Sequence, residues 1–282
     1  METILLQPSG YCSGVKRAID LALKEANKES KPLIMLSPLI HNETALAKLA
    51  KENILMPQGD PVDIILDAPR GSRILFSAHG HPFSYDELCL LKGHESYDST
   101  CPFVYENMQK AATWEGAICY IGEISHEECK AFLANVPEAV CYELPEKKWN
   151  PLKLKGKNQP VGILCQTTLG NKEIEEAIED IRSFVPDATV LGRNCPSTRA
   201  RQENIERLSD VDALIVLGST TSSNSKRLAQ IGKEKGLPTF LALGLEEVKS
   251  LDLFSFKRIA LASGASTETQ TIQEVFTYLK SL

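Results

Sequence analysis

The sequence predicts an α/β fold: three small α/β domains with mostly parallel sheets, arranged as a pseudo-threefold trefoil. Three observations predict it. Short apolar segments alternate with helical patterns along the chain. Cys12, Cys101 and Cys195 divide the 282 residues into nearly equal parts. A similar order of helix, strand and polar cluster follows each of these cysteines, which indicates a repeated structural unit.

Each of the three cysteines stands directly before a predicted helix. After Cys12, the apolar residues of segment 15–26 recur at the spacing of one helix face. A proline follows both Cys101 and Cys195, and proline suits the first position of a helix, where its missing N–H is not needed. We therefore expect all three thiols at helix N-termini, a position that favours the thiolate form.

Two short apolar strands follow each helix, and each strand ends in small polar residues. The first polar cluster begins 29, 25 and 27 residues after its cysteine (41 − 12, 126 − 101 and 222 − 195). Open α/β sheets bind ligands at the carboxyl ends of their parallel strands, so these polar side chains are expected to line a site. The candidate donors are His41, His79, His126, Thr167, Ser222, Ser223, Asn224 and Ser266.

The repeat also predicts where the domains begin and end. The first α/β domain spans residues 13–100, the second 101–194 and the third 195–282. Residues 1–12 contain a strand with no helix before it. We expect this N-terminal strand to join the sheet of the third domain.

Composition excludes several classes of protein. The chain has 31 Lys and Arg against 37 Asp and Glu, a net charge of −6, and no basic block, which argues against nucleic acid as a partner. No apolar run is long enough to cross a membrane, and the first residues lack the features of a signal peptide. We therefore expect a cytoplasmic protein whose eight cysteines form no disulfide framework.

Three thiolates at one point suit an iron–sulfur cluster or, with a fourth ligand such as histidine, zinc. The alternative is that they are buried residues that mark a duplicated helix start. The surrounding donors and helix N-termini suit an anion such as phosphate or diphosphate. Glu128 is a candidate proton donor there, and its neighbour Glu127 is not excluded. His81 and His94 fall outside the pattern and are expected on the surface.

Taken together, the motifs resemble the 4-hydroxy-3-methylbut-2-enyl diphosphate reductase family (IspH/LytB). The resemblance covers nearly the whole chain and extends from the first cysteine to the last polar cluster. The motifs are GYCSGVKRAI at Cys12, LIHN at His41, FSAHG at His79, STCP at Cys101, the segment His126–Glu128, QTTL after Cys165, Cys195-x-x-Thr198-x-x-Arg201-Gln202, GSTTSSNS before Lys226 and SGAS at Ser266.

The resemblance implies a function and a cofactor. The cofactor is a 4Fe-4S cluster at the centre of the trefoil, with Cys12, Cys101 and Cys195 as ligands and one open iron. The cluster passes two electrons, taken from ferredoxin or flavodoxin, to 4-hydroxy-3-methylbut-2-enyl diphosphate. With two protons the hydroxyl leaves as water, and isopentenyl and dimethylallyl diphosphates form in the methylerythritol phosphate route to isoprenoids.

The resemblance also assigns roles to the polar residues. Glu128, tied to Thr167, delivers the proton, and both are the catalytic residues. The remaining donors hold the diphosphate of the substrate, with Thr167 among the substrate-binding residues. These are His41, His79, His126, Ser222, Ser223, Asn224 and Ser266.

Some positions depart from the family pattern. Glu127 stands where the family commonly has proline, and Glu106 and Met108 replace a usual lysine and histidine. These departures leave a divergent homologue with another diphosphate substrate as one alternative. A non-catalytic diphosphate-binding protein and a zinc hydrolase with three cysteine ligands are the others.

Overall fold

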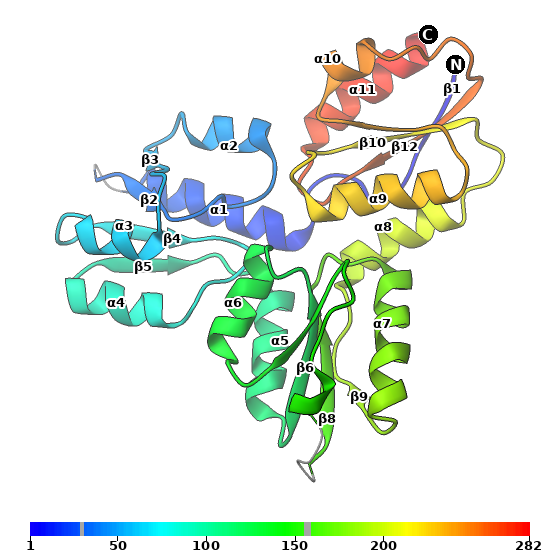
Figure 1. Cartoon of the computed structure of the whole chain (residues 1–282). Helices are drawn as coiled ribbons and strands as arrows, with labels where there is room; N and C mark the ends of the chain where they lie inside the picture. Colours follow the sequence, from blue (N-terminus) through cyan, green and yellow to red (C-terminus); the bar gives the residue numbers. More distant parts are fainter. Residues whose placement is uncertain (29–30, 155–158) are drawn as a thin grey trace. The chain divides into compact units, whose positions relative to one another are not determined.

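The computed structural model describes residues 1–28, 31–154 and 159–282. Twelve strands of this part of the chain form three four-stranded sheets, one in each third of the sequence (Figure 1). All pairs between these strands are parallel. The prediction of an α/β protein with three small units and parallel sheets is therefore confirmed.

The sheet of the last third has the strand order β1-β12-β10-β11. The N-terminal strand pairs in parallel with β12, with Thr3 opposite Ile259, so it joins the last third as the sequence predicts. The strands are β1 (Glu2–Leu5), β10 (Ala213–Leu217), β11 (Thr239–Ala242) and β12 (Arg258–Ser263). The helices are α8 (Pro196–Glu206), α9 (Ser223–Glu234), α10 (Leu245–Lys249) and α11 (Thr269–Ser281).

Helices cover both faces of this sheet (Figure 1). Along β10, Ile215 packs with α10 and α11, while Leu214 and Val216 pack with α8 and α9. Successive residues of a strand point to opposite faces, and a sheet buried on both sides needs apolar residues at every position. This is why β10 reads as an unbroken apolar run that ends at the polar loop before α9.

The sheet of the first third has the order β3-β2-β4-β5. One of its two inner strands, β4, carries Arg73, which is 1% exposed and forms an ion pair with Glu25 at 3.1 Å. The strands are β2 (Leu33–Met35), β3 (Ile54–Leu55), β4 (Arg73–Phe76) and β5 (Glu95–Asp98). The helices are α1 (Ser13–Ala26), α2 (Glu43–Leu49), α3 (Pro61–Asp67) and α4 (Ser84–Lys92).

The sheet of the middle third has the order β7-β6-β8-β9. Cys119 on β6 packs toward α7, while its neighbour Tyr120 packs toward α5 and α6. The strands are β6 (Ala117–Gly122), β7 (Val140–Glu143), β8 (Val161–Cys165) and β9 (Thr189–Val190). The helices are α5 (Pro102–Thr113), α6 (Glu127–Asn135), a short 3₁₀ helix (Pro151–Lys153) and α7 (Asn171–Phe184).

The chain divides into two compact units. Unit one comprises residues 1–16, 41–48 and 195–282, and unit two comprises residues 17–40 and 49–194. The sheet of the last third belongs to unit one, and the other two sheets belong to unit two. The three predicted domain boundaries and the trefoil arrangement stay predictions.

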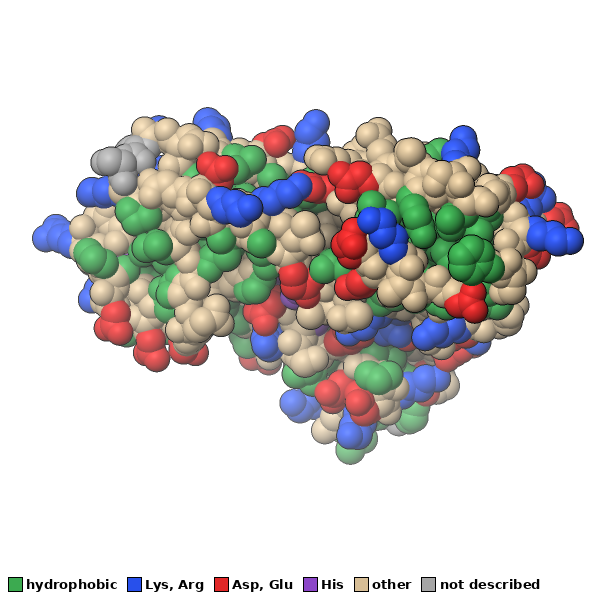
Figure 2. Space-filling model, turned by 90° about the horizontal axis from the view of Figure 1, so that it is seen from above, with side chains coloured by type: hydrophobic (Ala, Val, Ile, Leu, Met, Phe, Trp, Pro, Cys, Tyr) green, Lys and Arg blue, Asp and Glu red, His purple; other side chains and the backbone are tan. Residues whose placement is uncertain are grey.

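Surface charge and helix length bear on two classes that the composition argues against, nucleic-acid-binding proteins and membrane-spanning proteins. On the face drawn in Figure 2, acidic and basic side chains are interspersed, so charges of the two signs offset each other over short distances. Within the described ranges, the helices are too short or too polar for any of them to span a bilayer.

Candidate functional site

Two of the three candidate cysteine ligands belong to unit one. Cys195 is the N-cap of α8, and its Sγ lies 3.4 Å from the backbone N–H of Thr198 and 3.2 Å from the hydroxyl of the same residue. The Sγ of Cys12 lies 3.4 Å from the backbone N–H of Val15 in the first turn of α1. Both thiols are half-buried. The structure therefore places both sulfurs next to backbone N–H groups in the first turn of a helix, where the sequence predicts them.

Arg201 connects the surroundings of these two cysteines. Its guanidinium is 4% exposed and donates to the carbonyls of Gly10 at 2.7 Å and Ser263 at 2.9 Å. Burial lowers the pKa of Arg201, and the nearby Cys12 and Cys195 oppose that shift, as negative charge on their sulfurs would. The sequence placed Arg201 inside a motif without giving it a role. The structure shows a buried cation that fixes the loop before Cys12.

The segment around His41 is joined to the loop of Ser266 within unit one. The Ser266 hydroxyl donates to the carbonyl of His41 at 3.2 Å, and the Asn42 side chain donates to the carbonyl of Ser266 at 2.8 Å. Two of the predicted diphosphate donors, 225 positions apart in the sequence, are therefore brought together.

Glu43 ties the same segment to the loop between β10 and α9. Its carboxylate accepts hydrogen bonds from the hydroxyls of Ser219 at 2.8 Å and Thr221 at 3.1 Å. Burial raises the pKa of Glu43, but the bonds from Ser219, its own backbone and Thr221 outweigh burial and hold the pKa below its usual range. The sequence reasoning missed this residue, because a single glutamate in the first turn of a helix has the appearance of an ordinary N-terminal carboxylate.

The N-terminus of α9 carries three more predicted donors. Ser222 is its N-cap and accepts from the backbone N–H of Ser225 at 3.3 Å. Ser223 and Asn224 are both buried. Asn224 is 4% exposed, yet neither polar atom of its side chain has a partner among the described residues. A buried amide without partners costs free energy, which an anion bound at this helix N-terminus would remove.

Unit two holds Cys101 and two of the predicted histidines. Cys101 is the N-cap of α5, and its backbone N–H donates to the carbonyl of Ala78 at 2.9 Å, next to His79. The rings of His79 and His126 are perpendicular, with centroids 5.6 Å apart. The structure therefore brings the histidines of two different sheets into contact.

Glu128 and Thr167 make the closest polar contact among the predicted site residues of unit two. Glu128 is 2% exposed. Its Oε1 accepts from the backbone N–H of Thr167 and its Oε2 accepts from the Thr167 hydroxyl, both at 2.7 Å. Burial raises the pKa of Glu128 to about 7, although the bonds from Thr167 and Tyr120 act in the opposite direction. A carboxyl with this pKa can hold and release a proton near neutral pH.

The positions that depart from the family pattern do not disturb this contact. His126 is the N-cap of α6, and its Nδ1 accepts from the backbone N–H of Glu128 at 3.1 Å. Glu127 is half-exposed and pairs with Lys130 at 3.0 Å, which favours Glu128 as the proton donor. The other two departures lie on α5, where Glu106 pairs on the surface with Lys110 and Met108 is buried.

One expectation about the histidines is wrong. His81 and His94 are 6% and 8% exposed and not on the surface. His81 stacks on Phe76 at 3.8 Å and lies 2.7 Å from a carboxylate oxygen of Asp86. The Nε2 of His94 lies 3.0 Å from a backbone carbonyl. In both residues the Nε2 atom has a close polar partner, so the imidazole can be buried at a lower cost in free energy.

The residues present fit an iron–sulfur cluster in their chemistry. Cys12, Cys101 and Cys195 are half-buried and lie at helix N-termini, whereas Cys129 and Cys165 are buried among apolar side chains, as expected of packing residues. Partly accessible thiolates with N–H donors are the usual ligands of such clusters. Within either unit, no three described His, Cys, Asp or Glu side chains form a group that could hold a metal ion.

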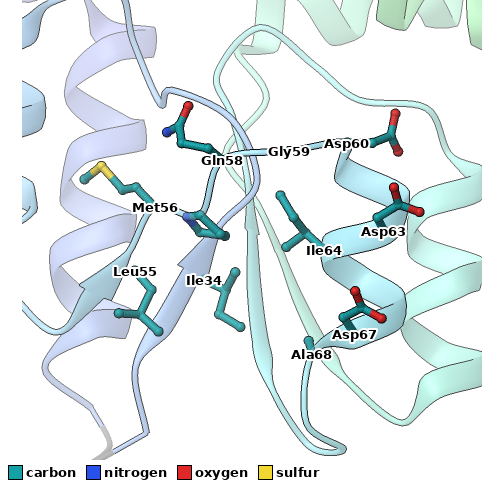
Figure 3. Close-up of a pocket in the computed structure, with 11 residues that line it drawn as sticks. Ile34, Leu55, Met56, Gln58, Gly59, Asp60, Asp63, Ile64, Asp67 and Ala68 are labelled. Carbon is teal, nitrogen blue, oxygen red and sulfur yellow. The ribbon is translucent and has the colours of Figure 1, made fainter.

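A pocket of about 740 Å³ lies elsewhere in unit two, between β3 and α3 (Figure 3). Its apolar lining includes Ile34 and Ile64. The carboxylates of Asp60, Asp63 and Asp67 lie along α3 at its edge. These like charges would repel a diphosphate, and none of the predicted site residues lines this pocket.

Comparisons with known proteins identify the family. A family model described as "LytB protein" matches residues 3–280. Proteins named 4-hydroxy-3-methylbut-2-enyl diphosphate reductase are similar over almost the whole chain: that of Bacillus thuringiensis (strain Al Hakam) is 30% identical, over 99% of this chain and 90% of its own length, and that of Aquifex aeolicus (strain VF5) is 28% identical, over 98% and 94%.

Solved structures agree with this similarity. The structure titled as the E-1-hydroxy-2-methyl-but-2-enyl-4-diphosphate reductase from Plasmodium falciparum matches with a TM-score of 0.86 at 27% identity, over 99% of this chain and 88% of that chain. A second reductase structure, titled as the terminal enzyme of the non-mevalonate pathway, matches with a TM-score of 0.70 at 27% identity and covers both chains fully. The chain therefore belongs to the LytB family, as its motifs predict.

Proposed function

We propose that this chain is an oxidoreductase that converts 4-hydroxy-3-methylbut-2-enyl diphosphate to isopentenyl and dimethylallyl diphosphates and water. Its relatives carry the name of this reductase over nearly their whole length. The observation in the structure that supports the chemistry best is the buried contact between Glu128 and Thr167, with a pKa of Glu128 near 7.

The LytB family is a family of iron–sulfur enzymes, and a 4Fe-4S cluster supplies single electrons and an open iron site when it is bound. Cys12, Cys101 and Cys195 are the ligands that we propose for it. Two features of unit one support this assignment: N–H donors face the two sulfurs there, and Arg201 lies near both. The cation would offset part of the negative charge of a cluster with three thiolates.

We assign the contacts of the diphosphate to polar donors unit by unit. In unit one these are the N-terminus of α9, with the partnerless amide of Asn224, and the linked His41 and Ser266. In unit two they are His79 and His126, whose rings are in contact, and Thr167, which contacts Glu128. A diphosphate has several charged oxygens, so a set of donors on different loops suits it better than a single basic side chain.

Glu128 delivers the proton that lets the hydroxyl of the substrate leave as water. Its proton sits on Oε2, where the only described polar neighbour is the hydroxyl of Thr167 at 2.7 Å. Thr167 can pass its own proton to the leaving oxygen as it receives one from Glu128, so the threonine is unchanged and the glutamate ends as a carboxylate. Three donors then stabilise that carboxylate in a site without bulk water.

The electrons reach the cluster from a ferredoxin or a flavodoxin in this proposal. The reaction belongs to the methylerythritol phosphate route, and we propose a cytoplasmic location. Glu106 pairs with Lys110 on the surface and Met108 packs in the apolar cluster of Tyr120, so neither replaces a polar contact of Glu128 with Thr167. We therefore propose that the substrate is that of the family.

Purification without oxygen tests this function. We expect a brown protein with about four iron and four sulfide per chain, and both product diphosphates by mass spectrometry when an artificial reductant and the substrate are added. A colourless protein with bound zinc would support a zinc hydrolase instead. A protein that binds isopentenyl diphosphate but holds no iron after reconstitution would be a non-catalytic diphosphate-binding protein.

A further inference from the structure

The two oxygens of the Glu128 carboxylate have different donors. Oε1 accepts from the backbone N–H of Thr167 at 2.7 Å and from the hydroxyl of Tyr120 at 3.4 Å. Oε2 accepts from the hydroxyl of Thr167 at 2.7 Å. A backbone N–H can only donate, whereas a threonine hydroxyl can reverse and accept. The two oxygens are therefore not equivalent as sites for a proton.

Tyr120 is held in this position by packing on several sides. It lies on β6 and is fully buried. Its ring stacks on Phe132 of α6, with centroids 3.9 Å apart and an angle of 14° between the planes. A Cβ atom at Gly122 would lie 2.9 Å from the Tyr120 ring, so the glycine leaves the space that the ring needs. Packing alone would be served by phenylalanine, and the hydroxyl is the part that reaches Glu128.

The hydroxyl of Tyr120 acts as a donor over the whole working pH range. Burial is the main cause that raises the pKa of Tyr120 well above its usual value, and the nearby charge of Glu128 is the second. The other titratable groups near Tyr120 and Glu128 are the thiols of Cys129 on α6, Cys141 on β7 and Cys165 on β8. The ring of His126 faces the backbone N–H of Glu128.

We propose that Tyr120 is a positioning residue that, together with the backbone N–H of Thr167, keeps Oε1 of Glu128 as a hydrogen-bond acceptor and so places the transferable proton on Oε2. This inference rests on the proposed role of Glu128 as the proton donor. It adds a residue that the site motifs do not contain, because Tyr120 lies inside an apolar strand before the His126–Glu128 segment.

The proposal accounts for every proton of the transfer. In the acid form, Oε2 carries the hydrogen and donates it to Oγ1 of Thr167, while Oε1 keeps two donors. After transfer, the carboxylate accepts from all three donors, and Tyr120 stabilises this charged product. Removing the Tyr120 hydroxyl should therefore raise the pKa of Glu128, because its hydrogen bond stabilises the charged carboxylate more than the neutral acid.

Tyr120→Phe tests this proposal, because it keeps the ring, the stacking and the burial. The matched control is Tyr142→Phe on the neighbouring strand, whose hydroxyl donates to Asp180 at 2.9 Å and not to Glu128. The pKa of Glu128 is measured on the oxygen-free holoenzyme from the infrared C=O band of its protonated carboxyl, assigned by its loss in Glu128→Gln. We expect Tyr120→Phe to raise this pKa by about half to one unit.

Turnover gives a second readout. The pH at which kcat begins to fall should move upward by the same amount in Tyr120→Phe, with KM unchanged, and Tyr142→Phe should move neither quantity. Difluorotyrosine placed at position 120 keeps the hydroxyl and makes it a stronger donor, so it should lower the pKa of Glu128 and the pH at which kcat begins to fall.

The two readouts separate this proposal from the proposed function. An unchanged infrared titration of Glu128 in Tyr120→Phe and in the fluorinated protein would overturn the role of Tyr120, whatever the activity. If the infrared shifts are as expected but the wild type forms no product, Tyr120 still controls the proton of Glu128, and the proposed function is what fails.

Discussion

Thr167 contacts both oxygens of Glu128, through its backbone N–H and its hydroxyl, each at 2.7 Å. The contact joins the loop after β8 to the first turn of α6. It holds the carboxyl in one orientation in a buried place, where burial raises its pKa to about 7.

The pH dependence of turnover should report this raised pKa. Glu128 is protonated below pH 7 and ionised above it, and the reaction needs the protonated form. We therefore expect kcat to be constant on the acidic side and to fall about tenfold per pH unit well above the pKa. The measurement is kcat at saturating substrate with an artificial reductant. A rate that rises through neutral pH would mean that the carboxylate form is the active one.

Serine at position 12, 101 or 195 should abolish cluster binding, because a cubane held by two protein thiolates is poorly retained. Iron and sulfide are counted in each variant after anaerobic reconstitution. Cys141→Ser is the matched control, since Cys141 is also half-buried but lies on β7, and it should keep full iron content. Full occupancy in Cys195→Ser would show that Cys195 only caps α8.

Asn224→Ala should weaken the binding of isopentenyl diphosphate by roughly tenfold or more, because a donor to a charged oxygen contributes about 1.5–3 kcal/mol. Titration calorimetry measures the affinity. The control on the same helix is Gln230→Ala, whose side chain is exposed and pairs with Glu234. Equal affinities in the two variants would remove the N-terminus of α9 from the diphosphate site.

The buried ion pair of the first sheet should matter for stability. Glu25→Ala leaves the guanidinium of Arg73 buried and without its carboxylate, which typically costs about 3–5 kcal/mol. Lys28→Ala removes an exposed partner of the same carboxylate, 3.6 Å away, and should cost less than about 1 kcal/mol. Urea unfolding of both variants checks the difference. Similar midpoints would mean that Arg73 finds other partners in the variant.

The sequence predicts the repeated parts of the molecule well. All three helices after the cysteines begin where expected, at Ser13, Pro102 and Pro196. The periodicity of apolar residues and a proline at the first helical position are local signals. They indicate where a helix begins even when the tertiary fold is unknown. For the same reason the strand ends and their polar clusters could be read from spacing alone.

What the sequence does not reveal depends on contacts between distant residues. The spacing rules do not distinguish the buried His81 from an exposed histidine: its ring packs on Phe76, and the distant Asn135 donates to its backbone carbonyl. Arg201 reaches Gly10 across 191 positions of the sequence, and Tyr120 reads as one more residue of an apolar strand. The one signal in the sequence that could have pointed to Tyr120 is its polar hydroxyl within an otherwise apolar strand.

The most direct test of the proposed function and mechanism compares Glu128→Gln with Glu127→Gln. Glutamine keeps the shape of the side chain but does not release a proton, and positioned acid catalysis typically contributes about 10²–10⁴-fold. Glu127 is half-exposed and paired with Lys130, so its variant should stay near the wild type. Product diphosphates are quantified by mass spectrometry under anaerobic conditions, with iron content and substrate affinity measured alongside. We expect Glu128→Gln to keep iron and substrate binding while turnover falls by about two orders of magnitude or more. Wild-type turnover in Glu128→Gln, or the loss of activity in Glu127→Gln instead, would contradict the proposed mechanism.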